Sequence, residues 1–486
     1  MLGRMWISMS VLIFLLVNSA LALSAQRISQ DMTVNLFPMS IQEADAIKKH
    51  TSPNQAKPLA KDGTSSTTSS SGSPATTTSS SCISYDPSTI TITVSCSSAR
   101  LSDIYNRLHD NSILAKQSPA GTWFLNANIV IAKGGTLNID STDTKWLKIS
   151  SKVTRSAGVT SKFGPAYWID VHGGLKIDSV KITSWDPTTN YYDITNGSRT
   201  GSGVFILGAP RPSIVVENNA TGTTDITNSE IAYLGFEQGK HKGGSGLSYY
   251  YGGDGSVIRN NDIHHVYFGL YTFGVGHMIV ENNIIRNSGH YGLDPHTGTH
   301  DMIIRNNTVY DNNGSGIICS LNCYNILIEN NKVHDNAENG IDFSRNMYNS
   351  IARNNVVYNE AQGIFVSQSH NNEANNNTLT DNEDAIYVNS GSTNNKLHDN
   401  IIMNSKSYAI LIKNGSSSNT FYSNKISSTN AQGLIISQDS SSKNNLFSNN
   451  QIISNGRAST TTPAEPSTAA AGDTIKHPHG KRTSTK

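Results

Sequence analysis

The chain has 486 residues, a formal net charge of +1 and 15% charged residues. Phosphate binding needs a clear excess of lysine and arginine, so this balance argues against a nucleic-acid partner. The length would suit two or three ordinary domains. A repeat protein grows by adding coils, however, so the number of domains does not follow from the length here.

The first 25 residues are typical of a secretory signal peptide. Arg4 precedes an apolar run over residues 7–16, and small residues follow over 18–25. The run is short for a membrane span, and it ends in an Ala-x-Ala-like exit. We expect residues 1–25 to be removed, with no transmembrane span left, and the protein to be secreted, periplasmic or at the cell surface. A retained N-terminal anchor is the alternative.

Residues 26–81 and 456–486 are predicted to be disordered. The first segment is rich in serine and threonine, and the second ends in a basic stretch from Lys476. Such compositions bury too little apolar area to offset the entropy of ordering. The folded domain is therefore expected over residues 82–455.

The four cysteines are an even number, which fits an oxidising compartment. Cys82 and Cys96 flank a turn followed by a strand-like segment, so we expect them to form a disulfide. Cys319 and Cys323 lie four residues apart and could close a small loop, but their pairing stays open.

A short helix is expected at the start of the folded domain, because Leu101, Ile104, Tyr105 and Leu108 fall at helical spacing. It would cover the open end of the first coil of a solenoid. Strand-like segments follow at 123–125, 129–132, 136–139, 168–171, 175–177 and 204–207.

A repeat of about 24 residues runs over residues 200–455. A small residue precedes an apolar-x-apolar triplet at Gly246, Gly269, Gly292, Gly316, Gly340, Gly363, Ala385, Ala409 and Gly433. Asparagine pairs recur in step with it, from Asn260-Asn261 to Asn376-Asn377. Two markers in phase predict an all-β right-handed parallel β-helix with a short N-terminal capping helix. We interpret the asparagines as turn residues that hydrogen bond from coil to coil.

Strand alternation assigns the faces of one sheet. The first and third residues after each glycine are apolar and should point inward, and the second and fourth should face solvent. The outward residues form two predicted ladders: Ser248, Tyr271, Asp294, Ile318, Asp342 and Phe365, and Tyr250, Phe273, His296, Ser320, Ser344 and Ser367. Aromatic rings along such a groove suit a linear polysaccharide.

The coil Tyr291-Gly-Leu-Asp-Pro-His296 departs from the pattern, because Pro295 takes an inward strand position. Proline removes a ladder hydrogen bond, and a broken local rule is a pointer to function.

With these residues the chain resembles the periplasmic mannuronan (alginate) C5-epimerase family over about residues 100–400. The segments that carry the resemblance are 182–186, 229–236, 268–271, 291–296, 302–307 and 316–320. The resemblance implies that His296 and Tyr291 are an acid–base pair, with Asp294 beside them. It also implies an acidic linear polysaccharide as the partner.

The chain departs from that family at two places. The family usually has aspartate and arginine where this chain has Thr297-Gly298, and Leu321 stands where the family has an arginine thought to neutralise the substrate carboxylate. Arg345, one coil further along, and Lys240 and Lys242 are the candidates to replace that arginine.

Inversion at C5 of a uronic acid needs a base on one face, an acid on the other, and a cation or acid against the carboxylate. His296 titrates near neutral pH and suits the base, whereas Tyr291 would serve as acid if nearby cations lower its pKa. Asp294 would orient His296 or help to neutralise the carboxylate. We expect Tyr250, Tyr271, Phe273, Ser320 and Asp342 to contact the substrate, with Asp342 at a neighbouring sugar.

The same first step followed by loss of the O4 substituent is lyase chemistry, and the sequence does not separate the two. A non-catalytic glycan-binding β-helix or a metal-handling β-helix would also fit these residues. We expect a monomer without a cofactor or metal, because calcium has no motif here and the scattered histidines lack paired ligand spacing.

Overall fold

The computed structural model describes residues 81–152, 166–194, 211–236, 244–454 and 457–460. The predicted signal peptide, all but the last residue of the linker, the strand expected at 204–207, and Lys240 and Lys242 lie outside the described residues.

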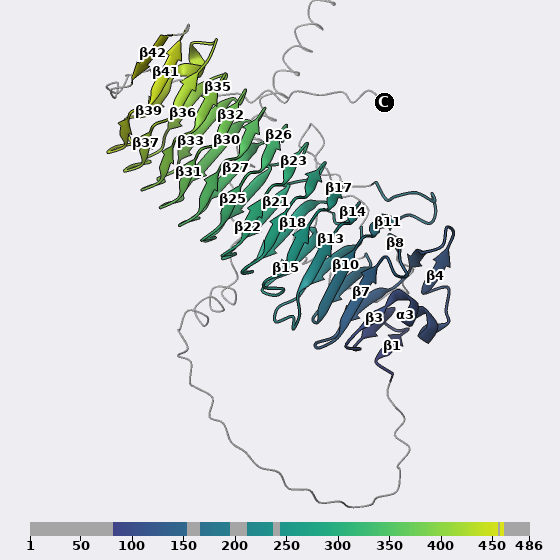
Figure 1. Ribbon diagram of the computed structural model, residues 1–486. Coiled ribbons are helices and arrows are strands. Elements are labelled where there is room, and N and C mark those ends of the chain that lie inside the picture. Colours follow the sequence, from purple (N-terminus) through teal and green to yellow (C-terminus); the bar gives the residue numbers. More distant parts are fainter. Residues whose placement is uncertain (1–80, 153–165, 195–210, 237–243, 455–456, 461–486) are drawn as a thin grey trace, which may run out of the picture. The chain divides into compact units, whose positions relative to one another are not determined.

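The described strands stack into three long sheets, and each coil adds one strand to each sheet (Figure 1). Apart from the antiparallel pairs β1/β2, β4/β5 and β41/β42, neighbouring strands are parallel. This confirms the predicted right-handed parallel β-helix.

Sheet A contains β1 (Ile83–Asp86), β2 (Thr91–Val94), β6 (Asn128–Ile131), β9 (Trp168–Val171), β12 (Ser213–Val216), β15 (Gly246–Tyr250), β18 (Phe268–Phe273), β21 (Leu293–His296), β24 (Ile317–Ser320), β27 (Asn339–Ser344), β30 (Gln362–Ser367), β33 (Asp384–Asn389), β36 (Tyr408–Ile412) and β39 (Ile436–Gln438). Sheet B contains β3 (Ala99–Arg100), β7 (Thr136–Asp140), β10 (Gly174–Asp178), β13 (Thr224–Thr227), β16 (Val257–Arg259), β19 (Ile279–Glu281), β22 (Ile303–Arg305), β25 (Leu327–Glu329), β28 (Ile351–Arg353), β31 (Glu373–Asn375), β34 (Lys396–His398), β37 (Thr420–Tyr422) and β40 (Leu446–Ser448). Sheet C contains β4 (Leu114–Gln117), β5 (Thr122–Leu125), β8 (Trp146–Ser150), β11 (Lys181–Trp185), β14 (Glu230–Ala232), β17 (Asp262–His264), β20 (Ile284–Arg286), β23 (Thr308–Tyr310), β26 (Lys332–His334), β29 (Val356–Tyr358), β32 (Thr378–Thr380), β35 (Ile401–Met403), β38 (Lys425–Ser427), β41 (Gln451–Ser454) and β42 (Arg457–Thr460). A short 3-10 helix, η1 (Gln432–Leu434), precedes β39, and β42 falls in the segment that the sequence assigned to the tail.

The repeat glycines are required by close packing at the start of the sheet A strands. A Cβ atom at Gly340 would lie 2.3 Å from Val357 Cγ1, and one at Gly292 would lie 2.5 Å from Val309 Cγ1. The chain crosses so near to the valines of sheet C that no side chain fits.

The asparagine pairs behave as predicted. The first residue of each pair has a left-handed backbone, with φ of 58° at Asn260 and 56° at Asn330. The second is buried: Asn331 Nδ2 donates to Asn355 Oδ1 at 3.0 Å and to the Ile304 carbonyl at 2.9 Å. A continuous side-chain ladder therefore runs along the turns after sheet B.

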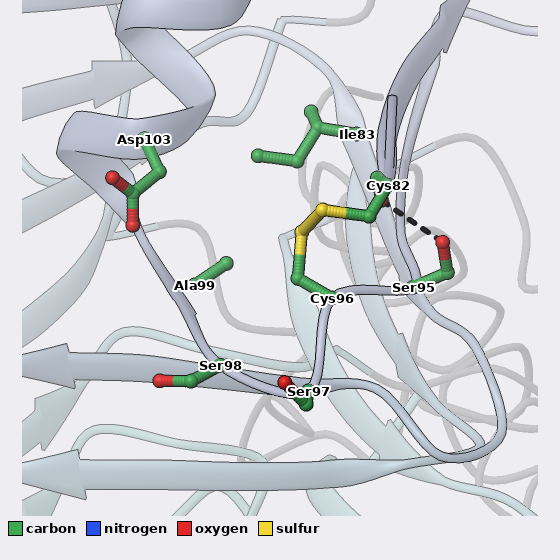
Figure 2. Close-up of a pocket in the computed structure, with 8 residues that line it drawn as sticks. All are labelled: Cys82, Ile83, Ser95, Cys96, Ser97, Ser98, Ala99 and Asp103. Carbon is green, nitrogen blue, oxygen red and sulfur yellow. Dashed lines mark hydrogen bonds between the residues drawn. A yellow bond between two sulfur atoms is a disulfide. The ribbon is translucent and has the colours of Figure 1, made fainter. Parts of the chain in front are cut away.

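The predicted capping helix is present as α3 (Leu101–Leu108), with Leu101 and Ile104 buried against the first coil. The carboxylate of Asp103 accepts a hydrogen bond from the Arg100 backbone N–H at 2.8 Å and caps its first turn. Beside α3, Cys82 and Cys96 form the expected disulfide, with a shallow pocket around it (Figure 2). Among the described residues that line this pocket, Asp103 is the only one with an ionisable side chain.

Cys319 and Cys323 are both buried and both free, so they do not close a loop. The described helices include none that is long and apolar enough to cross a membrane.

Candidate active site

Sheet A carries the two ladders in the predicted register. The pairing joins Tyr271 to Asp294 and Phe273 to His296, and it continues from His296 to Ser320. Three coils of the solenoid therefore bring these side chains together from β18, β21 and β24.

The prediction that both ladders face open solvent is wrong for five of their members, which are buried: Ser248, Asp294, Ile318, Ser320 and Asp342. Asp294 is 3% exposed, Asp342 is 4% exposed and Ser320 is fully buried. Short side chains on the pleated surface are covered by longer neighbours, since the ring of Tyr271 flanks Asp294 in register and the guanidinium of Arg345 reaches over Ser320. On the outward face of sheet A, short polar side chains are therefore buried between larger neighbouring side chains.

Pro295 disturbs the sheet as its position predicted. Between β21 and β24 the register pairs Leu293 with Ile317 and His296 with Ser320, and it skips the two residues between them. The thiol of Cys323 donates to the Ser320 carbonyl at 3.1 Å and to the Pro295 carbonyl at 3.5 Å. One buried cysteine thus ties the proline strand to the turn of the next coil.

His296 is held between two partners. Its Nδ1 makes a hydrogen bond with Thr297 Oγ1 at 2.5 Å, and Nη2 of Arg345 lies 3.3 Å from its Nε2. Since a guanidinium only donates, Nε2 accepts and the ring proton is on Nδ1. Burial, followed by the Arg345 charge, lowers the pKa of His296 to about 3. The expected titration near neutral pH is therefore wrong: the imidazole is neutral, and an arginine occupies its lone pair.

Arg345 is the cation that the structure brings to this histidine. Its backbone is left-handed, with φ of 50°, in the turn after β27. From there its Nη2 also donates to Ser320 Oγ at 2.8 Å, so the side chain reaches back across β24 toward β21. A cation from the next coil thus lies where Leu321 supplies none.

Tyr291 precedes the repeat glycine of the His296 coil and is half-buried. Its ring packs edge-on against His290, with 3.9 Å between centroids. Burial raises the pKa of Tyr291 well above its usual range, and the charges of Glu338, Asp294 and Asp342 raise it further, while Arg345 opposes them. The pKa lowering expected from nearby cations is therefore wrong, and the phenol keeps its proton.

The two buried carboxyl groups are also biased toward their protonated forms. Burial raises the pKa of Asp294 well above its usual range and that of Asp342 to about 7. Asn339 Nδ2 donates to Asp342 Oδ2 at 3.1 Å. The Oδ1 atoms of Asp294 and Asp342 are buried and make no hydrogen bond within the described part of the chain. Unsatisfied polar atoms of this kind are what a bound ligand or water would satisfy.

Aromatic rings form one wall beside these groups. The centroid of the Tyr271 ring lies 5.6 Å from that of His296, and Phe273 lies 6.2 Å from the same imidazole. Tyr250 adjoins both, at 5.7 Å from Tyr271 and 6.2 Å from Phe273. The predicted substrate-binding aromatics therefore lie on the histidine side of the site.

A third set of side chains on sheet A, which the two predicted ladders do not include, also contributes to the site. Two residues that precede repeat glycines, Tyr291 and Asn339, lie beside the buried carboxyl groups. The Tyr291 phenol is near Glu338, Asp294 and Asp342, and Asn339 donates to Asp342. Sheet A pairs Asn339 with Gln362, and Gln362 with Asp384. The repeat glycines identify the position before them in every coil, but only Tyr291 was predicted to be a site residue at that position.

A second group of histidine and aspartate side chains lies outside the two ladders. Among the described residues, one group of three has its ligand atoms within 4.8 Å of one another: His277, His300 and Asp301. These residues lie in the turns that follow β18 and β21.

Three stacked parallel sheets with inward apolar ladders place the chain among the parallel β-helix proteins. A family model described as periplasmic copper-binding protein (NosD) matches residues 216–409 and 360–465, together more than half of the chain. The chain belongs to this family. No curated protein sequence matches it significantly.

Solved structures of similar fold include the crystal structure of the periplasmic alginate epimerase AlgG. It has a TM-score of 0.64 and 22% sequence identity, over 75% of this chain and 85% of that one. A single-site mutant of AlgG has a TM-score of 0.63 and 23% sequence identity, over 74% of this chain and 85% of that one. The A-module of the Azotobacter vinelandii mannuronan C-5 epimerase AlgE6 has a TM-score of 0.42 and 15% sequence identity, over 68% of this chain and 91% of that one. At these identities the likeness to AlgG establishes a shared fold.

Proposed function

We propose that the protein is an exported polysaccharide-modifying enzyme that inverts C5 of uronic acid residues in a linear acidic polysaccharide. The observation that carries the proposal is the contact of the Arg345 guanidinium with His296 Nε2 and Ser320 Oγ. It places a cation for a sugar carboxylate directly beside a neutral base. The fold shared with a periplasmic alginate epimerase supports the choice of substrate class.

Before substrate binds, the base is blocked, because Arg345 donates to the nitrogen that would take the C5 proton. A uronate carboxylate offers this guanidinium a charged, bidentate acceptor in place of a neutral nitrogen. We infer that the substrate draws Arg345 onto its carboxylate. That movement frees Nε2 and removes a positive charge that opposes protonation of the ring.

The carboxylate must also be neutralised for the C5 proton to leave. Arg345 supplies a positive charge, and Asp294 supplies a protonated carboxyl group whose pKa burial raises. Donors fixed in a dry site stabilise the negative charge that develops on the carboxylate oxygens.

In the proposed step His296 Nε2 takes the proton as the C5–H bond breaks, and the electron pair is delocalised into the carboxylate. The Tyr291 phenol then donates its proton to the opposite face of C5, which forms the new C5–H bond. His296 is left protonated and Tyr291 deprotonated, and proton exchange through solvent restores both. The raised pKa of Tyr291 ensures that the phenol is protonated at the start.

Lyase activity is the alternative outcome of the same first step, because loss of the C4 oxygen substituent would follow proton removal. Incubation of polymannuronate, and then of other polyuronates, in deuterated water separates the outcomes by proton NMR. An epimerase incorporates deuterium at C5 and yields guluronate signals from polymannuronate. A lyase yields an unsaturated product that absorbs ultraviolet light.

Variants test the assignment of roles. His296→Gln and Tyr291→Phe should each lower the rate at which guluronate forms from polymannuronate by about 100-fold or more, the usual contribution of a general acid or base. His334→Gln is the matched control, since this imidazole stacks between Tyr310 and Tyr358 on sheet C. Absence of C5 exchange with every polyuronate, together with polymer binding that His296→Gln leaves unchanged, would establish a non-catalytic glycan-binding protein instead.

A further inference from the structure

We propose that the C-terminal end of the β-helix binds the same end of a second copy of this chain, in place of the monomer expected from the sequence. The end consists of β39 (Ile436–Gln438) of sheet A and β40 (Leu446–Ser448) of sheet B, in the yellow part of the solenoid (Figure 1). In the proposed dimer β40 pairs with its own copy in the antiparallel direction. This surface is separate from the proposed acid–base chemistry, because β39 lies six strands along sheet A from β21.

The two ends of the solenoid are closed differently. At the N-terminal end β1 turns back on β2 in sheet A, β4 pairs antiparallel with β5 in sheet C, and α3 follows β3 of sheet B. At the C-terminal end, within the described part of the chain, an antiparallel pair closes sheet C alone, through β41 and β42. Among the described strands, β39 and β40 have one neighbour each, β36 and β37. Sheets A and B therefore end on strand edges whose backbone groups point away from the sheet.

The apolar core is less covered at this end than inside the solenoid. Phe447 stacks on Phe421 with 5.0 Å between ring centroids, but Phe421 is fully buried and Phe447 is half-buried. Ile436 is half-buried as well, whereas Ile410, its partner in register, is fully buried. Leu446 is 65% exposed on β40. Each inner coil receives cover from the coil that follows it, and a second copy would supply that cover here.

Neither edge strand carries the features that normally prevent edge-to-edge pairing. Natural sheet edges are protected by lysine, proline or a bulge. The sequence of β39 is Ile-Ser-Gln and that of β40 is Leu-Phe-Ser, so neither has a charge or a proline. Gln438 satisfies one turn carbonyl, since its Nε2 donates to the Ser442 carbonyl at 2.8 Å. That contact lies within one coil and closes neither edge.

The composition of the tail argues against residues 461–486 as the cover. They follow β42 in the chain, but Ile475 is their only large apolar residue. They also include three prolines, which lack the backbone N–H that a strand pair needs. Such a segment offers little apolar area to Leu446 and Phe447.

The lack of net charge favours a second copy over a charged partner. Residues 430–454 contain one acidic residue, Asp439, and one basic residue, Lys443, so their charges cancel. A neutral surface attracts neither a polyanion nor a polycation. An antiparallel pair of β40 strands centred on Phe447 brings the two Phe447 rings together, and it places Leu446 beside Ser448 of the second copy. The same apolar edge thus serves both copies, as a two-fold axis requires.

The closed N-terminal end limits the assembly to two copies. Head-to-tail stacking would need a receiving edge at that end, where β1, β4 and α3 already close the sheets. A contact between two like ends uses up both and leaves no further edge. Because two edge strands and one coil end make a small contact, the dimer should dissociate on dilution.

Sedimentation equilibrium of the full-length protein over a range of concentrations tests the proposal. Leu446→Lys puts a charge at an exposed position of β40, where the fold does not depend on leucine. The matched control is Thr420→Lys, one coil inside the end, because Leu446 pairs in register with Thr420 and Thr420 with Lys396. Lysine is therefore already accepted in this column. A chain that ends at Thr460 tests whether residues 461–486 take part.

We expect the wild type, Thr420→Lys and the shortened chain to pass from monomer to dimer as concentration rises, without larger species. Leu446→Lys should weaken association by about 10-fold or more, because each dimer carries the substitution twice and an ammonium replaces an apolar contact. Circular dichroism checks that the variants are folded. Amide hydrogen exchange of the wild type gives a local readout, since β39 and β40 should become protected as the dimer forms and β1 should not.

Four outcomes would overturn the proposal. They are a wild type that stays monomeric at every concentration, a dimer that Leu446→Lys leaves unchanged, assembly into larger species, and dimerisation by the shortened chain alone. The last would show that residues 461–486 cover this end.

Discussion

At the scale of single residues, burial biases the ionisable side chains of the site, among them His296, Asp294 and Tyr291, toward their uncharged forms. His296 is neutral because it is buried and touches Arg345, and Asp294 is biased toward its protonated form because it is buried. Residue type alone predicts neither the size of the His296 shift nor the protonated bias of Asp294, since both depend on burial. The sequence therefore identified the groups correctly as members of one coil and assigned the wrong titration range to His296 and Tyr291.

Removal of the Arg345 charge should raise the pKa of His296. In Arg345→Ala the imidazole no longer meets a guanidinium, so its pKa should rise from about 3, yet stay below 6.5 because burial is the larger cause. Nitrogen-detected NMR of the imidazoles during a pH titration measures this shift. Arg353→Ala is the control, since Arg353 pairs with Glu329 on sheet B. An unchanged His296 titration in Arg345→Ala would contradict the contact.

Asp342 should make the protein less stable as the pH rises. Its folded pKa of about 7 exceeds the ordinary value of 3.8, so the folded state holds this proton more tightly. The stabilisation is fully present below about pH 4 and is lost as the pH rises through 7, with an upper limit of about 4 kcal/mol. Asp342→Asn should therefore match the wild type at pH 4 and melt at a higher temperature at pH 8. A melting difference that is the same at both pH values would argue against a titrating Asp342.

At the scale of elements, the second asparagine of each pair should matter far more than the first. Asn331→Ala leaves the Ile304 carbonyl and the donors of Asn307 without their partner, and each unsatisfied buried group costs about 1–3 kcal/mol. Asn330→Gly should be nearly neutral, because the side chain is exposed and glycine readily adopts its φ of 56°. Thermal unfolding of both variants tests this contrast. Equal losses would show that the turn backbone, and not the buried ladder, provides the stability.

The same elements show how far the sequence could predict the structure. Because one repeat sets the register, the pairing of Phe273 with His296, and of His296 with Ser320, followed from counting residues. The repeat period does not say which long side chains fold over short ones, so the burial of Ser320 beneath Arg345 was not predictable. The reach of Arg345 back across β24 depends on the rotamer of one side chain in a left-handed turn, which has no periodic signal.

At the scale of the whole molecule, the ladders of sheet A extend well beyond the proposed chemistry. Tyr387 on β33 packs against Phe365 on β30, with 5.2 Å between ring centroids, and it lies four strands along the sheet from β21. Strands in a sheet are about 4.8 Å apart, so this aromatic pair ends roughly 19 Å from the His296 coil. A polymer that runs along the sheet would contact both places at once.

Turnover should therefore depend on the length of the oligomer. Tyr387→Ala should raise the KM for oligomers long enough to span ~19 Å, and leave kcat and the KM of shorter ones unchanged, because a remote contact that is equal in ground and transition states affects binding alone. Deuterium incorporation at C5 across a series of purified oligouronates gives both constants. If Tyr387→Ala raises the KM of short and long oligomers equally, the aromatic pair acts on the fold of the site. If the substitution changes the KM of neither, the polymer crosses the sheet in another direction, and the groove is confined to the coils around His296.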